Sequence, residues 1–298
     1  MKIILPLEIT GANLIDTNVT ETLPVWDEAT AYVTADQVRV IQADGTGIAY
    51  EALAGNTGKD PAENPAEWLD LGPTNLWAMF DKKVGTRTVL EGSVDVSIDV
   101  TGRADSLALL NLTGTDVDVV VADADGNTIY DENYPLVSVD GIDNWYDYFF
   151  AEIETTDKLI LTDLPNNYNT TVRITVNYAD ATAGVGWFAI GRLVDFGVTE
   201  KGMGIGITDY SLKEADDFGN LFVSERPYSG TVVARALVEK RRVDPVYRTL
   251  AGIRATPVVW IPADAYTSSI VVGFFREFKI AIEYPTYSLC NIEIEGLT

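Results

Sequence analysis

Apolar residues recur at every second position in several stretches of the chain, and this alternation constrains the fold more than any other feature. A β-strand places successive side chains on opposite faces, so such runs fit strands with one buried face. Turn-forming groups such as ADGTG, DADGN and LPNNYN lie between them. The spacing predicts an all-β chain built from sandwiches or jelly rolls. The runs are SVDVSIDV (93–100), VDVVVADADGNTIYDE (117–132), TVRITVNY (171–178) and TVVARALVEKRRV (231–243).

Helical signals are nearly absent. The single candidate, WLDLGPTNLWAMF, contains a Gly-Pro break that limits any helix there to one or two turns. At the N-terminus, the apolar run of MKIILPLEITGANL is interrupted by Pro6 and Glu8. It is too short for a signal peptide or a membrane span, so we expect a first strand and no insertion into a membrane.

Composition divides the chain into four segments. Residues 1–23 are expected to form a leading strand and linker, and residues 24–74 a small segment bounded by aromatic residues and rich in Gly and Pro. Residues 75–197 are predicted to form a jelly-roll sandwich, and residues 198–298 a second β-rich domain. The large rings of the sandwich segment are candidates for its core, although alternation would also send some of the later ones outward: Trp77, Phe80, Trp145, Tyr148, Phe149 and Phe150.

Charge and missing residue types exclude several functions. The 45 acidic and 21 basic residues give a net charge of −24, which opposes nucleic-acid binding. The dense cationic cluster Lys240-Arg241-Arg242 is interpreted as a solvated strand end. There is no histidine, so histidine-based triads and histidine-ligated zinc are excluded. Cys290 is the sole cysteine, which rules out an intrachain disulfide and favours a buried, inert thiol.

Catalysis and metal binding receive little support from the residues. With so many carboxylates, pairs suited to glycoside hydrolysis are inevitable, but no spacing marks a cleft, and we expect no enzyme. Asp123, Asp125 and Asn127 surround Gly126 in an order that can ligate calcium, but the distal Glu of a full calcium loop is not aligned. An ordinary hairpin turn explains the same residues and is preferred. No other cofactor is predicted.

The small segment 24–74 poses the main functional question. It has little area to bury, so Trp26, Tyr32, Tyr50 and Trp68 could supply its core. The same rings could instead stack on sugars while Asn, Asp and Glu bind the hydroxyl groups. The residues alone leave both interpretations open.

The order of residues in this segment resembles the small chitin-binding modules of bacterial chitinases. The resemblance implies a three-stranded carbohydrate-binding-like module, with sugar contacts from Trp26, Tyr50 and Trp68 and with Tyr32 in the core. The second aromatic residue of the pattern is absent, since Leu53 and Ala54 follow Ala52. The matching residues are Trp26, Thr30-Ala31-Tyr32, Asp36-Gln37-Val38, Tyr50-Glu51-Ala52, Asn56, Pro61, Pro65 and Trp68.

Stretches along the rest of the chain resemble virion structural proteins of tailed bacteriophages that carry the same module. This resemblance implies a virion protein of the tail, in the baseplate, tip or fibre region. Its partners would be other tail proteins, further copies of itself in a symmetric assembly, and a glycan of the host surface. The stretches include LGPTNLWAMFDKKVGTRT, SLALLNLTG, VGWFAIGRLVDFGVTEKGMGIGITDYS, ATPVVWIPADA and LCNIEIEGL.

Two alternatives remain open. The chain could be a secreted polysaccharide-binding accessory protein, which would be expected to carry a cleavable signal and a catalytic partner. It could also be a purely architectural tail protein with no sugar binding. The aromatic residue missing after Ala52 is the reason for the second alternative.

Overall fold

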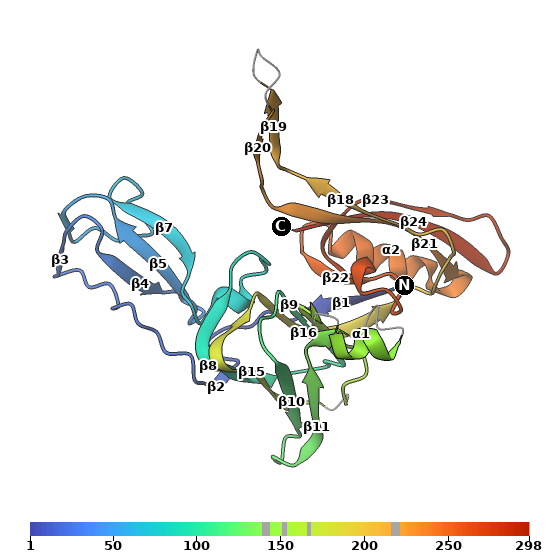
Figure 1. The fold of residues 1–298 in the computed structure, drawn as a ribbon, viewed down its shortest axis with the longest axis horizontal. Helices are drawn as coiled ribbons and strands as arrows, with labels where there is room; N and C mark the ends of the chain where they lie inside the picture. The colour runs from blue at the N-terminus through green and yellow to red at the C-terminus, as the bar shows by residue number, and fades with distance from the viewer. Residues whose placement is uncertain (139–143, 151–153, 166–167, 216–220, 298) are drawn as a thin grey trace. The chain divides into compact units, whose positions relative to one another are not determined.

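The computed structural model describes residues 1–138, 144–150, 154–165, 168–215 and 221–297. Strands dominate the described chain (Figure 1), so the predicted all-β class is confirmed. The chain forms two compact units. Unit 1 comprises residues 1–7, 105–107 and 189–298, and unit 2 comprises residues 8–104 and 108–188. These limits differ from the four predicted segments because the first strand pairs with the C-terminal part of the chain.

Unit 1 is built on an antiparallel sheet with strand order β16-β1-β22-β23-β24-β21-β17, and β18 also pairs with β21. The predicted first strand is β1 (Lys2–Pro6), which lies between β16 and β22. Its core is a buried cluster that includes Ile3, Phe196, Leu250 and Trp260. The other strands are β16 (Trp187–Asp195), β17 (Val198–Thr199), β18 (Gly204–Asp209), β19 (Leu212–Ala215), β20 (Leu221–Ser224), β21 (Tyr228–Glu239), β22 (Val258–Ile261), β23 (Val271–Ala281) and β24 (Tyr287–Gly296).

One helix of unit 1 corrects the sequence analysis. The run TVVARALVEKRRV was expected to be a strand to its end, but β21 stops at Glu239, and the turn η2 (Lys240–Arg242) leads into α2 (Val243–Gly252). Pro245 lies in the first turn of α2, where a missing N–H is tolerated. Val246 and Leu250, four residues apart, are the buried side chains. This spacing was present in the sequence, but the preceding alternation obscured it.

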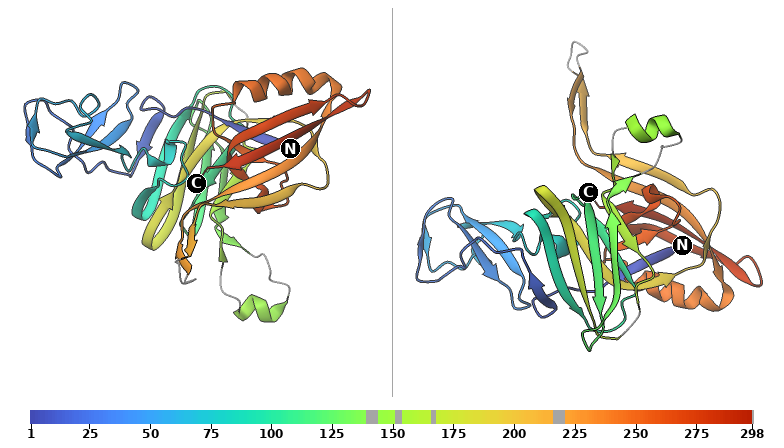
Figure 2. Two further views of the ribbon diagram at one scale, coloured as in Figure 1. Left: turned by 90° about the horizontal axis from the view of Figure 1, so that it is seen from above. Right: turned by 60° about the horizontal axis from the view of Figure 1, so that its bottom comes forward.

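Unit 2 contains a twisted antiparallel sheet with strand order β11-β10-β15-β8-β2 (Figure 2). Alternate residues of its long strands are fully buried, among them Val96, Val119 and Ile174. The elements outside the small module are β2 (Leu14–Thr17), η1 (Ala78–Phe80), β8 (Thr88–Val100), β9 (Ser106–Leu110), β10 (Asp116–Ala122), β11 (Thr128–Pro135), β12 (Val137–Ser138), α1 (Trp145–Phe150), β13 (Glu154–Thr155), β14 (Lys158–Leu161) and β15 (Thr170–Val185).

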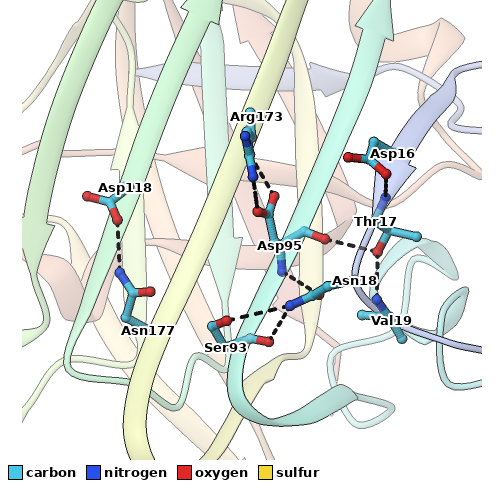
Figure 3. A network of polar contacts seen from close by, with 9 residues as sticks. All are labelled: Asp16, Thr17, Asn18, Val19, Ser93, Asp95, Asp118, Arg173 and Asn177. Atoms are coloured by element: carbon cyan, nitrogen blue, oxygen red, sulfur yellow. Dashed lines mark hydrogen bonds and ion pairs between the residues drawn. The ribbon is translucent and has the colours of Figure 1, made fainter.

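The opposite face of this sheet is polar, as the alternation predicts. Arg173 on β15 donates from Nε to both oxygens of Asp95 on β8, at 2.9 and 3.1 Å (Figure 3). Asn177 bridges Asp116 and Asp118 of β10 through Nδ2, at 2.8 Å each. These cross-strand pairs fix the register of a face turned toward solvent.

The small module lies within unit 2 and has sheets of its own. Its sheet has the order β4-β5-β7, and β3 pairs with β6, so the predicted three-stranded module is confirmed. The strands are β3 (Ala31–Tyr32), β4 (Gln37–Ile41), β5 (Gly47–Ala52), β6 (Asn56–Thr57) and β7 (Trp68–Pro73). The helical candidate downstream contains only the single turn η1, as expected from its Gly-Pro break.

The rings predicted for the sandwich core separate into two groups. Trp77 is buried, as expected of a core residue, whereas Phe80 is half-buried. Trp145 and Phe149 are 77% and 69% exposed, and placing them in the core was wrong. They lie on the short helix α1, to which the two-residue alternation of strands does not apply. The side chains of Tyr148 and Phe150 lie outside the described residues.

Candidate functional site

Two of the three rings predicted to touch sugar belong to the core of the small module. Trp68 is 2% exposed and Tyr50 is 6% exposed, and both pack in one cluster with Tyr32. The Trp68 indole donates from Nε1 to the Lys59 carbonyl at 2.9 Å and meets the Tyr32 ring edge-on at 5.2 Å. Burial, with Asp70 as a further cause, raises the pKa of Tyr50. Neither Trp68 nor Tyr50 offers a face on which a sugar could stack.

Trp26 is less buried than Tyr50 and Trp68. It is half-buried against the same cluster, and its backbone N–H donates to the Arg39 carbonyl at 2.9 Å. Within the described chain, the shielded Nε1 of Trp26 and Nε of Arg39 have no hydrogen-bond partner. Of the three predicted rings, Trp26 is therefore the one that keeps accessible surface. The placement of Tyr32 in the core, 8% exposed, agrees with the sequence analysis.

The surface of the module is aliphatic where a sugar-binding face would be aromatic. Val33, Leu53, Leu69 and Leu71 are each between 45% and 63% exposed. Leu53 occupies the position after Ala52, where the chitin-binding pattern has an aromatic residue. Aliphatic side chains lack the ring plane that stacks on a pyranose. The module has no open binding face formed jointly by Trp26, Tyr50 and Trp68, because Tyr50 and Trp68 are buried.

A groove of about 370 Å³ lies where the β4–β5 turn and β7 meet η1 and the residues that follow it. This volume falls within the range of about 300–1,000 Å³ that is usual for small-molecule sites. Its residues are Glu8, Ile9, Asp44, Thr46, Gly47, Ile48, Asp70, Gly72, Pro73, Trp77, Phe80, Asp81, Lys82 and Lys83.

Glycine contacts hold the walls of this groove together. A Cβ on Gly47 would lie 2.9 Å from Oγ1 of Thr74 and 3.2 Å from Cδ1 of Trp77, so the β5 backbone packs closely against both side chains. Gly11 donates its N–H to the Asp44 carbonyl at 2.9 Å, and a Cβ on Gly11 would lie 2.9 Å from Cα of Gly45. Gly45 itself has φ +85°, which favours glycine. The segment after β1 is thereby fastened to the β4–β5 turn.

The groove combines apolar and acidic side chains. Trp77 and Phe80 lie with their ring centroids 5.8 Å apart, beside Ile48 and Pro73. Since Trp77 is 6% exposed, only a strip of its ring reaches the groove, and the half-buried Phe80 offers more. Apolar surface beside a few fixed polar groups is typical of small-molecule sites.

The carboxylates of the groove differ in how they are held. Asp44 Oδ1 accepts hydrogen bonds from Thr46 Oγ1 at 2.7 Å and Thr46 N–H at 3.0 Å, and these bonds lower the pKa of Asp44. Asp70 Oδ1 accepts from the N–H of Gly72 at 2.7 Å. In both exposed residues the turn bonds use Oδ1, so Oδ2 is available to a ligand. Glu8 forms an ion pair with Lys82, whose Nζ lies 3.7 Å from Glu8 Oε1.

The turn between β10 and β11 contains the residues considered as calcium ligands, Asp123, Asp125 and Asn127. Asp123 Oδ1 accepts hydrogen bonds from the N–H groups of Asp125 and Asn127 at 3.0 and 2.9 Å. The bonds from Asn127 lower the pKa of Asp123, and Gly126 has φ +83°. This accounts for the three residues as a hairpin turn. Among the described residues, no three or more Asp, Glu, Cys or His side chains are placed to hold a metal ion.

A second surface feature belongs to unit 1. Among the residues that the structure describes, β19 and β20 pair only with each other, and this two-stranded ribbon projects from the end of β18 and β21 (Figure 1). We call residues 212–215 and 221–224 the arm. Polar contacts at its base include Lys213 Nζ to Asp209 at 2.6 Å and the N–H of Arg226 to Ser211 Oγ at 3.1 Å.

The arm carries apolar side chains on both of its faces. Leu221, Phe222 and Val223 are consecutive on β20 and are 67%, 64% and 53% exposed. Because neighbours on a strand point to opposite faces, Phe222 lies on one side of the ribbon and its two neighbours on the other. Three consecutive exposed apolar residues are unusual on a surface that only water contacts.

Two other predictions concern isolated side chains of unit 1. The basic cluster forms the turn η2 directly after β21, and not the strand end that was expected. Arg241 pairs with Glu239 at 2.7 Å with both side chains exposed, whereas Arg242 donates a hydrogen bond to the Asp195 carbonyl. Cys290 is buried, and burial raises the pKa of its thiol to about 11, in agreement with an inert thiol.

Within the described part of the chain, no helix is long and apolar enough to span a membrane.

Sequence reasoning missed the groove and the arm. Trp77 and Phe80 were recognised only as core candidates, and Asp44 only as part of the turn ADGTG. The groove joins residues from three distant stretches, and no local spacing marks it. The arm had a local signal, the run LFVS between polar residues, which resembles the beginning of any buried strand.

Comparisons with known proteins give little further guidance. No family model matches the chain, and no curated protein is similar to it. Two solved structures are similar to part of it, both of the lectin domain of lectinolysin: a complex with the Lewis b antigen and the complex of a His 62 mutant with Lewis b. Each is 13% identical and covers 39% of this chain and 82% of its own, with TM-scores of 0.27 and 0.28. These TM-scores are too low to transfer a fold or a ligand to this chain.

Proposed function

We propose that the chain is a structural subunit of a bacteriophage tail, in the baseplate, tip or fibre region, that contributes to attachment to host surface glycans. The observation that carries the assembly role is the arm, with Leu221, Phe222 and Val223 exposed on both faces of a two-stranded ribbon. The resemblance of the sequence to tail proteins supports the same role.

The arm favours assembly for an energetic reason. An isolated two-stranded hairpin is only marginally stable in water, and covering both of its faces would stabilise it. Complete burial of a fully exposed large apolar side chain contributes about 1.5–3 kcal/mol, and Leu221, Phe222 and Val223, which are 53–67% exposed, would gain roughly that fraction of it. The occupant to which we commit is a neighbouring copy of the chain, as in the symmetric assemblies that most oligomers form.

The groove supports the glycan role. It places the rings of Trp77 and Phe80 beside the exposed carboxylates of Asp44 and Asp70. Many copies on one particle would turn weak single-site binding into lasting attachment, because later contacts form at high effective concentration. We propose that this binding occurs without hydrolysis. A glycosidase acid needs a raised pKa, whereas hydrogen bonds from Thr46 lower that of Asp44.

The assembly role is tested by measuring the mass of the full chain in solution. We expect oligomers of the wild type at tens of micromolar, and a monomer when Leu221, Phe222 and Val223 are all replaced by Ser. The matched control replaces Ile15, Val89 and Val137, which are also exposed and apolar, by Ser, and it should leave the oligomer intact. A monomeric wild type, or equal loss of assembly in both variants, would contradict the proposal.

A purely architectural module is the second candidate. It is favoured by Leu53, Leu69 and Leu71, which present aliphatic surface suited to a protein neighbour. Retention of the chain on host cell envelopes separates the two candidates. Loss of retention when free glycans from that envelope are added supports sugar binding, and retention that glycans do not affect supports the architectural role.

A further inference from the structure

The acidic character of the groove suggests which sugars it accepts. Four carboxylates line it, from Glu8, Asp44, Asp70 and Asp81, against two ammonium groups, from Lys82 and Lys83. The surrounding chain adds to this imbalance, because its net charge is −24. The potential in the groove is therefore negative, and it favours a ligand that carries positive charge.

The carboxylates are not equally available to a ligand. Asp81 is occupied by hydrogen bonds from the Lys83 N–H at 2.8 Å and the Thr86 hydroxyl at 2.6 Å. Glu8 shares its charge with Lys82 at 3.7 Å. Asp44 and Asp70 have turn bonds to neutral groups only, so neither carboxylate has its charge balanced. These two are the groups that an incoming cation would meet.

The same groove offers apolar surface that a small inorganic cation does not use. Phe80, Pro73 and Ile48 lie beside the carboxylates, with a strip of Trp77. Within the described chain the carboxylates are not gathered as a metal site requires. A ligand that suits both features has an apolar ring face and an ammonium group. An aromatic ring also attracts such an ammonium group through its π face.

We infer that this groove binds an amino sugar whose amine is free and protonated, such as a glucosamine unit that is not acetylated. The ammonium group would bind the Oδ2 atoms of Asp44 and Asp70, and the sugar ring would lie on Phe80 and Pro73. N-acetylation removes the positive charge and adds bulk, so acetylated sugars should bind more weakly. This inference rests on the proposed glycan-binding role and specifies its ligand.

Calorimetric titration of the full chain tests the inference. The probes are the tetramer of glucosamine, the tetramer of N-acetylglucosamine, and putrescine, a diamine without a sugar ring. We expect the glucosamine tetramer to bind most tightly at pH 6. We also expect its affinity to fall with added salt, because both carboxylates are exposed.

Variants locate the site. Replacing Asp44 and Asp70 together by Asn keeps the oxygens that accept the turn bonds, and it should weaken binding of the glucosamine tetramer about three- to tenfold. The control replaces Asp125 and Asp131, exposed and distant in sequence, by Asn, which removes the same net charge. It should leave the affinity almost unchanged.

Each other result has a distinct meaning. Equal binding of both tetramers, or an equal loss in both variants, would overturn the inference and leave the glycan role in place. Putrescine binding as tightly as the glucosamine tetramer would also overturn it, since the sugar ring would then contribute nothing. Binding of neither tetramer would contradict both the inference and the glycan part of the proposed function, whereas the assembly role is judged separately by mass.

Discussion

Replacing Trp68 by Ala should unfold the small module while leaving the rest of the chain folded. The side chain is 2% exposed and fills the centre of a core that otherwise contains Tyr32, Val38, Tyr50 and Ala52. Truncating a buried Trp to Ala costs about 3–5 kcal/mol. We expect the upper part of that range, because the hydrogen bond to Lys59 and the edge-on contact with Tyr32 are lost as well.

This cost is comparable to the entire stability of a core of this size. Without disulfides, a domain below about 70–80 residues rarely gains more than about 3–5 kcal/mol from its core. The variant module should therefore have little or no stability of its own. It follows that loss of sugar binding in a Trp68 variant would report unfolding and would say nothing about a sugar contact.

Hydrogen–deuterium exchange of peptides within residues 31–73 measures the effect locally. A loss of 3–5 kcal/mol should speed exchange of the protected amides by roughly 10²- to 10⁴-fold. The matched control is Leu69→Ala, the adjacent residue on β7, which is 46% exposed and should change stability by less than about 0.5 kcal/mol. Exchange in the Trp68→Ala module as slow as in the wild type would refute the assignment of Trp68 to the core.

Four further outcomes follow from single substitutions and from Cys290. Gly191→Ala would drive a Cβ into the β1 backbone and should abolish soluble folding of unit 1, whereas Gly204→Ala, with nothing within 4 Å, should be tolerated in the same expression trial. Cys290, whose pKa burial raises to about 11, should resist iodoacetamide at pH 8 until the chain is denatured. Its thiol stays neutral in the folded chain while the unfolded thiol ionises, so its contribution to stability should decline as pH rises from about 8.5 toward 11, as denaturant titrations can show. Gly47→Val should destabilise the groove by about 1–3 kcal/mol through overpacking against Thr74 and Trp77, and unchanged exchange in peptides 44–80 would contradict these contacts.

Strands with one buried face were predictable from sequence because alternation is a local signal. The run 93–100 became part of β8, with Val94, Val96 and Ile98 buried and the intervening residues facing the polar network of Figure 3. The three-stranded module was also recognised, through the order of its residues. Both predictions depend on patterns that are complete within one short stretch.

Which aromatic rings of the module are exposed could not be predicted, because sequence does not tell which side of a ring is covered. Trp26, Tyr50 and Trp68 were candidates for sugar contact on equal terms, yet only Trp26 keeps accessible surface. The groove could not be predicted, because its residues come from separate stretches of the chain, such as Asp44 and Trp77, and no local spacing connects them. Helix α2 was missed because its spacing directly follows a clear strand.

Immunogold electron microscopy tests the central claim most directly. An antibody against this chain would be applied to tailed particles released from the culture that carries its gene. The proposed function predicts gold at the distal part of the tail, in a regular number of positions per particle. Particles without gold, with the chain free in the medium, would contradict a role in the tail and favour a secreted polysaccharide-binding protein.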